Sequence, residues 1–393
     1  MTHAIIIGGG IAGPVTALAL QRAGVTSTVY EAHAGRDDAG GWLTIAVNGL
    51  AALRSLDLHR PVMAAGFPTT TIGFLSGTGK PLGAVPIGGV LADGTVTHTL
   101  RRSELHRVLR EELQRRGPAL ERGKRLVSAQ EADGGVVARF ADGSEARGDL
   151  LIGADGIHSR VRQILDPGAP RPRYTGLGNM GGFTPAGRVD VPSGACTMVF
   201  GRRCFFGMVV APDGEVWWFA NPPRTTEIDR GELQSTSDEQ WRERLAAMFD
   251  GDRTPAAAVI RASLGPVIAG NQYDLPSVPV WRRGKLLIVG DAAHAAGPSS
   301  GQGASMAIED AVVLARCMRE HAEIEDAFAA YEQGRRARVE RVVAHGARVG
   351  STKTVGPLGR VLRDLMLPLF LRRAAREQGS GSMAWLFEHH AAV

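Results

Sequence analysis

Cysteine, lysine and long apolar runs are scarce in this chain of 393 residues. The three cysteines, Cys196, Cys204 and Cys317, are odd in number and show no C-x-x-C spacing, so we expect neither a disulfide framework nor a metal site. No apolar stretch approaches the roughly 20 residues that a membrane-spanning helix needs, so no integral membrane segment is expected. Lysine supplies few of the 45 basic residues, and arginine therefore carries nearly all of the positive charge.

The overall balance of residues is that of a globular protein, with 44% hydrophobic and 22% charged residues. The net charge of +5 is small and the basic residues are scattered, which argues weakly for anionic ligands and against nucleic acid. The N-terminus has no basic region before its first apolar run, and glycines break that run. We therefore expect no signal peptide and a cytoplasmic protein, either a monomer or a homodimer. The length favours two domains.

A glycine-rich turn follows the first apolar run. Residues 4–7 read as a strand, and residues 8–13 match G-x-G-x-x-G at the start of a helix that ends near Gly24. Gly8 permits the tight turn, Gly10 leaves the backbone open to a pyrophosphate, and Gly13 lets helix and strand pack closely. The first amides of the helix then face the anion.

A second strand, residues 27–30, ends at Glu31, whose carboxylate can accept hydrogen bonds from the two hydroxyls of an unphosphorylated ribose, as in FAD or NAD. The motif alone is weak in a chain with 51 glycines, but the order of strand, glycines, helix, strand and acid favours a dinucleotide site over an ordinary βαβ turn. The predicted cofactor contacts of this unit are Gly8, Gly10, Ile11, Ala12, Gly13 and Glu31.

Two later apolar strands also end in a glycine turn with an aspartate. Residues 149–156 end in Asp155 and Gly156, and residues 285–291 end in Gly290 and Asp291. After Asp291 a second glycine-rich loop, residues 297–303, leads into a helix from about Ala304. This loop can hold a second anionic or carbonyl-bearing part of the same ligand.

The middle of the chain has a different texture. Residues 73–97 and 174–280 contain short β-type segments broken by glycine and proline, and most of the aromatic residues lie there, so this part is the better place for an apolar ligand wall. In the pair Trp217 and Trp218 the side chains point to opposite faces of a strand, hence at most one lines a pocket.

Together, residues 8–13 with Glu31, residues 153–162 and residues 290–303 resemble the dinucleotide, "DG" and "GD" motifs of class A FAD-dependent aromatic monooxygenases. This family has the para-hydroxybenzoate hydroxylase fold and includes urate hydroxylase and tetracycline-inactivating enzymes. The resemblance implies an α/β fold with a Rossmann-like FAD-binding domain (1–72, 98–173 and 281–345), a mostly β substrate domain (73–97 and 174–280) and a helical C-terminal region (346–393).

The resemblance also implies roles for individual residues. Asp291 would bind the ribityl chain and Arg102 would contact FAD, while Asp155 would serve both FAD and the nicotinamide donor. The loop along the isoalloxazine would contribute Pro298, Gly301, Gln302 and Gly303. Arg36 either reaches the pyrophosphate or adenine or is a solvated loop charge. Some family members carry Asp after the loop proline, where this chain has Ser299, so a catalytic carboxylate is absent there.

The activity implied by the resemblance is NADH- or NADPH-dependent insertion of one oxygen atom from O2 into an aromatic, polycyclic or other electron-rich small molecule, through a C4a-hydroperoxyflavin. Two alternatives are a flavin reductase or dehydrogenase without oxygen insertion and a non-catalytic dinucleotide-binding protein. A phenol substrate would gain from a base. His294 is the obvious histidine, but a structural hydrogen bond is favoured for it.

Three further residues are candidates for contact with the substrate. Arg203 could reach an anionic substrate or the peroxide, although a sheet-surface ion pair is the favoured interpretation. Trp218 and Pro298 are the other candidates. Residues 359–373 are basic and amphipathic, and a helix packed over the body is favoured there over peripheral membrane contact.

Overall fold

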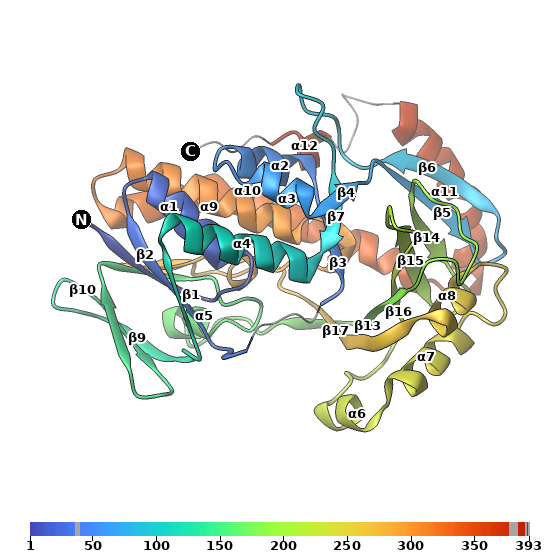
Figure 1. Cartoon of the computed structure of the whole chain (residues 1–393), viewed down its shortest axis with the longest axis horizontal. Helices are drawn as coiled ribbons and strands as arrows, with labels where there is room; N and C mark the ends of the chain where they lie inside the picture. Colours follow the sequence, from blue (N-terminus) through green and yellow to red (C-terminus); the bar gives the residue numbers. More distant parts are fainter. Residues whose placement is uncertain (36–39, 377–383, 390, 392–393) are drawn as a thin grey trace.

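The computed structural model describes residues 1–35, 40–376, 384–389 and 391, so Arg36 lies outside the described residues. Within them the chain forms two large sheets and two small ones. Figure 1 shows the two large sheets toward opposite ends of the long axis. The chain passes between them several times, so residues distant in sequence meet where they adjoin.

A six-stranded sheet contains the predicted dinucleotide unit. All of its neighbouring strands pair in parallel except the two at one edge, residues 282–283 and 286–288, which are antiparallel. The central strands are apolar throughout because helices and a small sheet cover both faces. The spatial order is β18 (Arg282–Arg283), β19 (Leu286–Ile288), β12 (Leu150–Gly153), β1 (His3–Ile7), β2 (Thr26–Glu31) and β8 (Ala119–Arg122).

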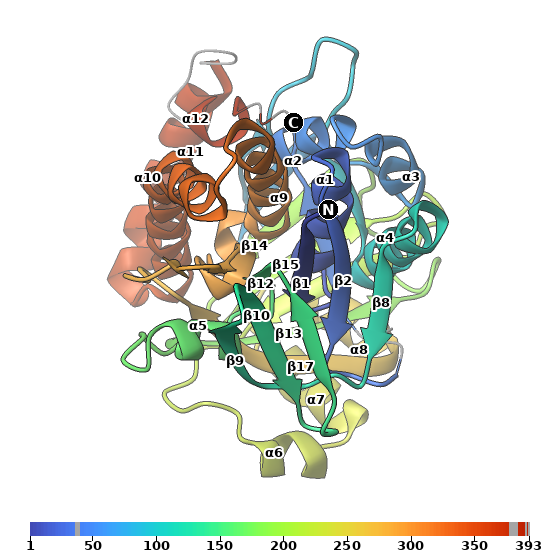
Figure 2. The same ribbon diagram turned by 90° about the vertical axis from the view of Figure 1, so that its left-hand side faces the viewer.

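Helices form a layer over this sheet. The long helices α1, α9 and α10 lie on one side of it, and a small antiparallel sheet lies on the other (Figure 2). The helix α1 packs along α9, and α10 packs on the outer side of α9. The helices are α1 (Ala12–Arg22), α2 (Val47–Arg54), α3 (His59–Ala64), α4 (Arg102–Arg116), α5 (Arg160–Leu165), α9 (Gly303–Glu320) and α10 (Ile324–Ser351).

Two three-stranded sheets complete this part. One is antiparallel, and its strands in spatial order are β11 (Glu145–Gly148), β10 (Gly135–Phe140) and β9 (Leu126–Ala132). The other joins the two large sheets and consists of β3 (Trp42–Ile45), β7 (His98–Arg101) and β4 (Gly66–Pro68).

The second large sheet has seven strands and contains segments from two separate parts of the chain, as the β-type texture of residues 73–97 and 174–280 predicts. Only β14 and β5 are parallel neighbours in it. The spatial order is β17 (Leu264–Asp274), β13 (Arg173–Thr184), β16 (Val216–Asn221), β15 (Phe205–Val210), β14 (Cys196–Phe200), β5 (Thr71–Ser76) and β6 (Pro81–Pro86).

Alternation along these strands gives the seven-stranded sheet two distinct faces. One face carries Phe206 and Trp218 and packs against α7 (Asp238–Ala247) and α8 (Ala256–Ala262). The short α6 (Arg230–Ser235) precedes α7. The other face carries Phe205 and Phe219 and is turned toward β3 and the C-terminal region.

The C-terminal region is helical, as expected from the sequence. The 3-10 turn η3 (Thr352–Thr354) follows α10 and leads to α11 (Pro357–Arg376), which packs on β6, and α12 (Ala384–Phe387) comes last. The predicted boundaries at 72 and 345 fall inside β5 and α10, because both elements continue unbroken past them. In the described part of the chain, no helix combines the length and apolarity needed to cross a membrane.

Candidate flavin site

Three predicted acidic residues lie at one edge of the parallel sheet. Strands β2, β1, β12 and β19 run in the same direction, with Ile7 beside both Tyr30 and Gly153. Their carboxyl ends therefore meet, and Glu31, Asp155 and Asp291 come from the ends of three of them. Ligands of open α/β sheets bind at this edge.

The glycine turn after β1 has the geometry that the motif predicts. Gly8 has a φ of +112°, and a side chain there would bring its Cβ within 2.3 Å of the carbonyl oxygen of Ala154. A Cβ at Gly13 would lie 1.9 Å from the carbonyl oxygen of Gly8, so helix and strand approach as closely as expected. At Gly10, by contrast, an added Cβ meets nothing within 4 Å. The backbone is thus open on the side where a phosphate would lie.

Glu31 closes one side of this turn. Its Oε2 accepts a hydrogen bond of 2.7 Å from the amide of Gly9, and its Oε1 accepts one of 2.8 Å from the amide of His33. The carboxylate is therefore held beside the glycine turn, and its remaining acceptor capacity faces the same edge of the sheet.

Asp155 is held by the start of α5. Its Oδ1 accepts a 2.5 Å hydrogen bond from the Ser159 hydroxyl, and its Oδ2 accepts from the amides of Arg160 (2.7 Å) and Val161 (3.1 Å). Burial raises the pKa of Asp155, although these hydrogen bonds oppose the rise. Its side chain anchors α5 to the edge of the sheet, and contact with a bound cofactor stays a prediction.

Asp291 lies in the 3-10 turn η1 (Gly290–Ala292) directly after β19. Its side chain is exposed to solvent, although many protein atoms lie around it. This partial desolvation raises the pKa of Asp291, while the nearby charges of His294 and Arg102 act in the opposite direction. Arg102, which begins α4, therefore lies near Asp291, as the predicted pair of cofactor contacts requires.

The second glycine-rich loop contains the 3-10 turn η2 (Pro298–Ser300) and leads into α9. Gly301 has a φ of +62°, and the amide of Gln302 donates to the Ser300 hydroxyl at 3.2 Å. The side chain of Gln302 is buried and accepts a 2.9 Å hydrogen bond from Asn48. Gln302 thus holds the loop to α2, and its own amide is already bonded within the loop.

Helices α1 and α9 begin side by side next to Gly290. A Cβ at Gly290 would lie 3.1 Å from the Cβ of Ala12 and 3.4 Å from that of Ala307. Two helix N-termini with unpaired amides therefore open on the same edge, where both favour an extended anionic ligand.

A buried ionic cluster lies beneath the loops. It consists of His294, Glu309, Asp310, Arg335 and Arg338. Arg335 donates to Asp310 and to Glu309, both at 2.7 Å, and His294 lies 2.5 Å from Asp310. The amide of Gly290 donates to Asp310 at 2.9 Å. His294 is therefore in the structural hydrogen bond favoured for it.

The charges of the buried ionic cluster outweigh the cost of burying them. Burial alone would raise the pKa of Asp310, but His294 and Arg335 hold that pKa well below its usual range. Likewise burial would raise the pKa of Glu309, and Arg338 and Arg335 lower it. Because Asp310 binds both Gly290 and His294, the cluster fixes the turn that carries Asp291.

An aromatic wall adjoins this edge from the seven-stranded sheet. Rings on the face of that sheet turned toward β3 meet rings of the small sheet, with Trp42 of β3 5.7 Å from Phe219 and Phe67 of β4 5.2 Å from Trp217 between ring centroids. The aromatic wall is defined as Trp42, Phe67, Phe183, Phe205, Trp217 and Phe219. Because Trp42 directly follows Gly40 and Gly41, next to Arg102, the wall meets the predicted cofactor edge.

The structure places two predicted substrate contacts away from this wall. Trp218 has no exposed surface and packs on the opposite face of the sheet, among the core residues under α7 and α8. Arg203 donates to the carbonyl oxygens of Ala247 and Met248 at the end of α7, where its charge favours the helix terminus. Neither side chain reaches the edge where Asp291 lies, because the strand alternation and the α7 terminus direct them elsewhere.

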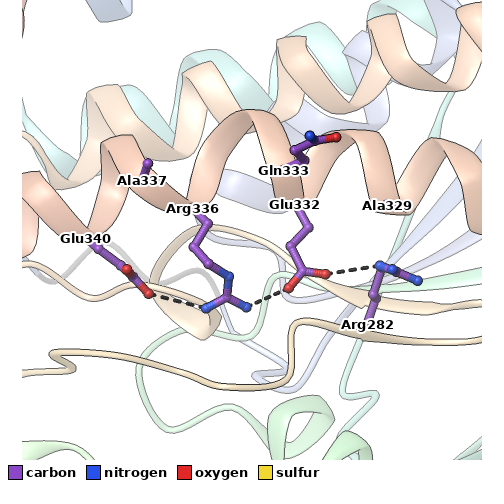
Figure 3. Close-up of a pocket in the computed structure, with 7 residues that line it drawn as sticks. All are labelled: Arg282, Ala329, Glu332, Gln333, Arg336, Ala337 and Glu340. Atoms are coloured by element: carbon purple, nitrogen blue, oxygen red, sulfur yellow. Dashed lines mark hydrogen bonds and ion pairs between the residues drawn. The ribbon is translucent and has the colours of Figure 1, made fainter.

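Two hollows lie near α10. One, of about 630 Å3, is lined by Arg282, Glu332, Arg336 and Glu340 on the outer side of the helix, and these side chains pair with one another (Figure 3). It is remote from the three acidic residues, and its charges satisfy each other. The other, of about 300 Å3, is lined by β13, β17, the end of α10 and the loop at 297–299. This second hollow adjoins the glycine-rich loop.

These features define a dinucleotide-binding protein in which one extended nucleotide is held by three strand ends and two helix N-termini. The residues fit FAD: Gly10 leaves space for a pyrophosphate, Glu31 is held beside the glycine turn where a ribose would lie, and Asp291 is exposed near Arg102. A ligand that contacts all of these residues must be extended, since it has to span from Glu31 to the loop at 297–303.

The chain belongs to the family of FAD-dependent monooxygenases. The model of the FAD binding domain matches residues 1–345. Aurachin C monooxygenase/isomerase from Stigmatella aurantiaca is 31% identical over 362 residues, which cover 88% of both chains. The FAD-dependent urate hydroxylase from Klebsiella pneumoniae is 29% identical and covers 86% of this chain and 87% of the relative.

Solved structures agree in fold. HpxO from Klebsiella pneumoniae, in complex with FAD and uric acid, has a TM-score of 0.83 and is 26% identical, with 97% of this chain and 98% of that chain covered. The tetracycline destructase Tet(51) has a TM-score of 0.70 at 18% identity and supports the fold alone. The chain is thus an FAD-dependent monooxygenase of the aromatic hydroxylase family.

Sequence reasoning missed the residues that support the site. Arg335 lies in a run of charged residues in α10 with no local signal that it is fully buried. Asn48 and Trp42 likewise have no motif of their own. The one available signal was the pair Glu309 and Asp310 within an otherwise apolar helix, since two adjacent acids on a buried face need cationic partners.

Proposed function

We propose that this protein uses NADH or NADPH as reductant and inserts one atom of O2 into an aromatic or other electron-rich small molecule. The observation that supports this proposal is the aromatic wall, which reaches Arg102 through Gly40 and Gly41 and provides apolar ring surface at the edge where the flavin ring would lie. Bound FAD, once reduced, supplies the activation of O2.

The residues of the chain contribute binding, orientation and exclusion of water. Phe219 and Trp42 offer ring faces for an aromatic substrate, which prefers offset or edge contacts with them. The loop of Pro298 faces the end of α10 and limits access of water from that side. The buried ionic cluster holds this arrangement through Asp310 and Gly290, so the loop is positioned before a ligand arrives.

The test starts from purified protein reconstituted with FAD. We expect a flavin absorbance spectrum, oxidation of NADH or NADPH that accelerates with a subset of aromatic compounds, and a product one oxygen heavier by mass spectrometry. With isotope-labelled O2 the added oxygen should carry the label. As a control, the variant Arg348→Met, which changes an exposed side chain of α10, should behave like the native protein.

Two results would contradict the proposal. If the protein oxidises NADH or NADPH but forms no oxygenated product with any compound of a broad aromatic panel, a flavin reductase is the better description. If the product formed under labelled O2 carries no label and O2 remains unconsumed, the added oxygen comes from water and oxygen insertion by the flavin is wrong.

A further inference from the structure

Lys353 lies on the same face of the seven-stranded sheet as the aromatic wall. It is in η3, directly after α10, and its Nζ donates a 2.7 Å hydrogen bond to Oδ1 of Asn221 at the end of β16. The ammonium group lies 4.3 Å from the ring centroid of Phe205 and 5.7 Å from that of Phe219. Asn221 is itself buried and is held by a 3.2 Å hydrogen bond from its Nδ2 to the carbonyl oxygen of Gly178.

This charge has no anionic partner among the described residues. Ring faces and one amide oxygen are its contacts, and they stabilise an ammonium much less than a carboxylate does. Burial lowers the pKa of Lys353 to about 7. The nearest titratable group is the thiol of Cys204, whose pKa is raised by burial, so it is neutral at pH 7. A positively charged, part-buried Lys353 therefore lacks an anionic partner among the described residues.

The surroundings place Lys353 beside the predicted substrate space. Phe219, which lies under the ammonium group, also contacts Trp42 next to the cofactor edge. On the other side, Gly350 at the end of α10 faces the Ser299 hydroxyl, which a Cβ at Gly350 would approach to 3.5 Å. Lys353 therefore lies where the aromatic wall, the glycine-rich loop and the end of α10 converge.

We propose that Lys353, positioned by Asn221, binds the acidic oxygen of an aromatic substrate, either a phenol-type hydroxyl or a carboxyl group. This inference rests on the proposed function and names a class of substrate for the same site. A substrate oxygen at Lys353 supplies the missing anion, and the ring of the substrate lies against Phe205 and Phe219. With a phenol, the neutral amine accepts the hydroxyl proton, and an ammonium and a phenolate result, with no other reactant needed.

The protonation of Lys353 can be measured directly because the chain has only four lysines. Reductive methylation with carbon-13 formaldehyde gives few lysine signals, and NMR follows each of them with pH. We expect one signal to titrate near pH 7 and to vanish in Lys353→Met. Addition of benzoate to the FAD-loaded protein should move that titration upward, since an anion stabilises the ammonium, whereas benzamide should leave it unchanged.

Binding supplies the second readout. In the FAD-loaded protein, matched pairs of aromatic acid and amide are titrated by calorimetry and by the change in flavin absorbance. We expect Lys353→Met to weaken binding of the acids at least tenfold and to leave the amides unaffected, while Lys353→Arg keeps most of the preference. The exposed Lys80→Met serves as the matched control, and thermal unfolding confirms that each variant is folded.

Equal binding of acids and amides by the FAD-loaded native protein, or unchanged binding of acids by Lys353→Met, would overturn the role of Lys353. That failure differs from failure of the proposed function. If FAD binds, NADH or NADPH is oxidised and oxygenated product forms, but Lys353 shows no preference for acids, only the acid subsite is wrong.

A second, independent observation concerns α11. The helix turns its polar side toward the protein: Arg360 donates to the carbonyl oxygen of Arg202, and Arg363 lies 4.3 Å over the ring of Phe200. Leu371 is the buried anchor against β6. Seven large apolar side chains of α11 remain exposed, each by 38% or more, and they are Leu358, Val361, Leu362, Leu365, Met366, Leu369 and Phe370.

This exposed face, named here the α11 stripe, is too large and too regular for a solvated helix. Its leucines at 358, 362, 365 and 369 follow the four-three spacing by which helices pair. Seven large side chains exposed to this degree give an apolar face comparable to the roughly 800 Å2 that each partner buries in a standard protein interface. We infer that the α11 stripe pairs with the same stripe of a second copy of this chain around a two-fold axis.

Light scattering after size-exclusion chromatography tests this pairing on the FAD-loaded protein. We expect a dimer for the native chain and a monomer for Leu365→Glu, with FAD content unchanged, whereas the exposed Arg372→Glu at the end of α11 should remain dimeric. A native protein that stays monomeric at high concentration overturns the inference. If that monomer also floats with vesicles of anionic phospholipid, the stripe contacts membranes instead.

Discussion

Replacement of Arg335 by methionine tests the buried ionic cluster most sharply. The Arg335 side chain has no exposed surface, and neither have the two carboxylates that it joins, Glu309 and Asp310. Methionine fills a similar volume but leaves Asp310 with His294 and the Gly290 amide, and Glu309 with Arg338 and Asn48. Breaking a buried ion pair by removing one partner costs about 3–5 kcal/mol, and we expect a loss of this size in the free energy of unfolding.

The pH dependence follows from the sign of the shift. The folded pKa of Asp310 is lower than its reference value of 3.8, so the group adds stability above that pH and loses it as the pH falls toward the folded pKa. Without Arg335 the folded pKa of Asp310 rises and this contribution shrinks. The difference between native and variant protein should therefore be largest near neutral pH and become smaller as the pH falls below about 4.

The assay is denaturant unfolding of the FAD-free proteins, followed by circular dichroism and tryptophan fluorescence, from pH 7 down to the lowest pH at which the native protein remains folded. The control, Arg348→Met, changes an exposed arginine of the same helix and should shift stability by no more than about 0.5 kcal/mol. A loss below about 1 kcal/mol for Arg335→Met at pH 7, or a difference that grows as the pH falls, would refute the reasoning.

Three further predictions concern the cofactor edge. Gly10→Ala should lower FAD affinity at least tenfold without changing the melting temperature of the FAD-free protein, because its Cβ meets only the space left for the ligand; flavin fluorescence titration measures this. Gly13→Ala should destabilise the FAD-free protein by about 1–3 kcal/mol in denaturant unfolding, since its Cβ collides with the carbonyl oxygen of Gly8, and a smaller loss contradicts the close approach. Asp291→Asn should weaken FAD binding about tenfold, because charge-assisted hydrogen bonds are lost. If the variant and the native protein bind FAD with equal affinity, Asp291 does not contact the cofactor.

Local patterns predicted much of the fold. The apolar run at residues 4–7, the glycines that follow it and Glu31 specify a strand, a tight turn, a helix and an acidic strand end through short-range sterics alone, and the structure has each of them. The same holds for the turn at Asp291. Parallel strands align their carboxyl ends, so a shared edge for the three acidic residues also follows from the pattern.

The position of the aromatic wall was harder to predict from the sequence. Alternation showed that Trp217 and Trp218 point to opposite faces, but the face that carries helices α7 and α8 depends on distant packing. Trp218, one of the candidate substrate contacts, belongs to the core instead. Arg203 was missed as a partner of the α7 terminus for the same reason, since the two lie more than forty residues apart in sequence.

The sequence by itself determined the class of ligand, because glycine turns and strand-end acids are local devices whose geometry needs only their neighbours in the chain. Tertiary structure alone decided which charges are paired. Arg335 is fully buried and Lys353 is part-buried, and both are cations of the C-terminal part of the chain, yet the fold surrounds one with carboxylates and the other with aromatic rings. That difference arises from segments far away in sequence, and it separates a structural charge from one that awaits a ligand.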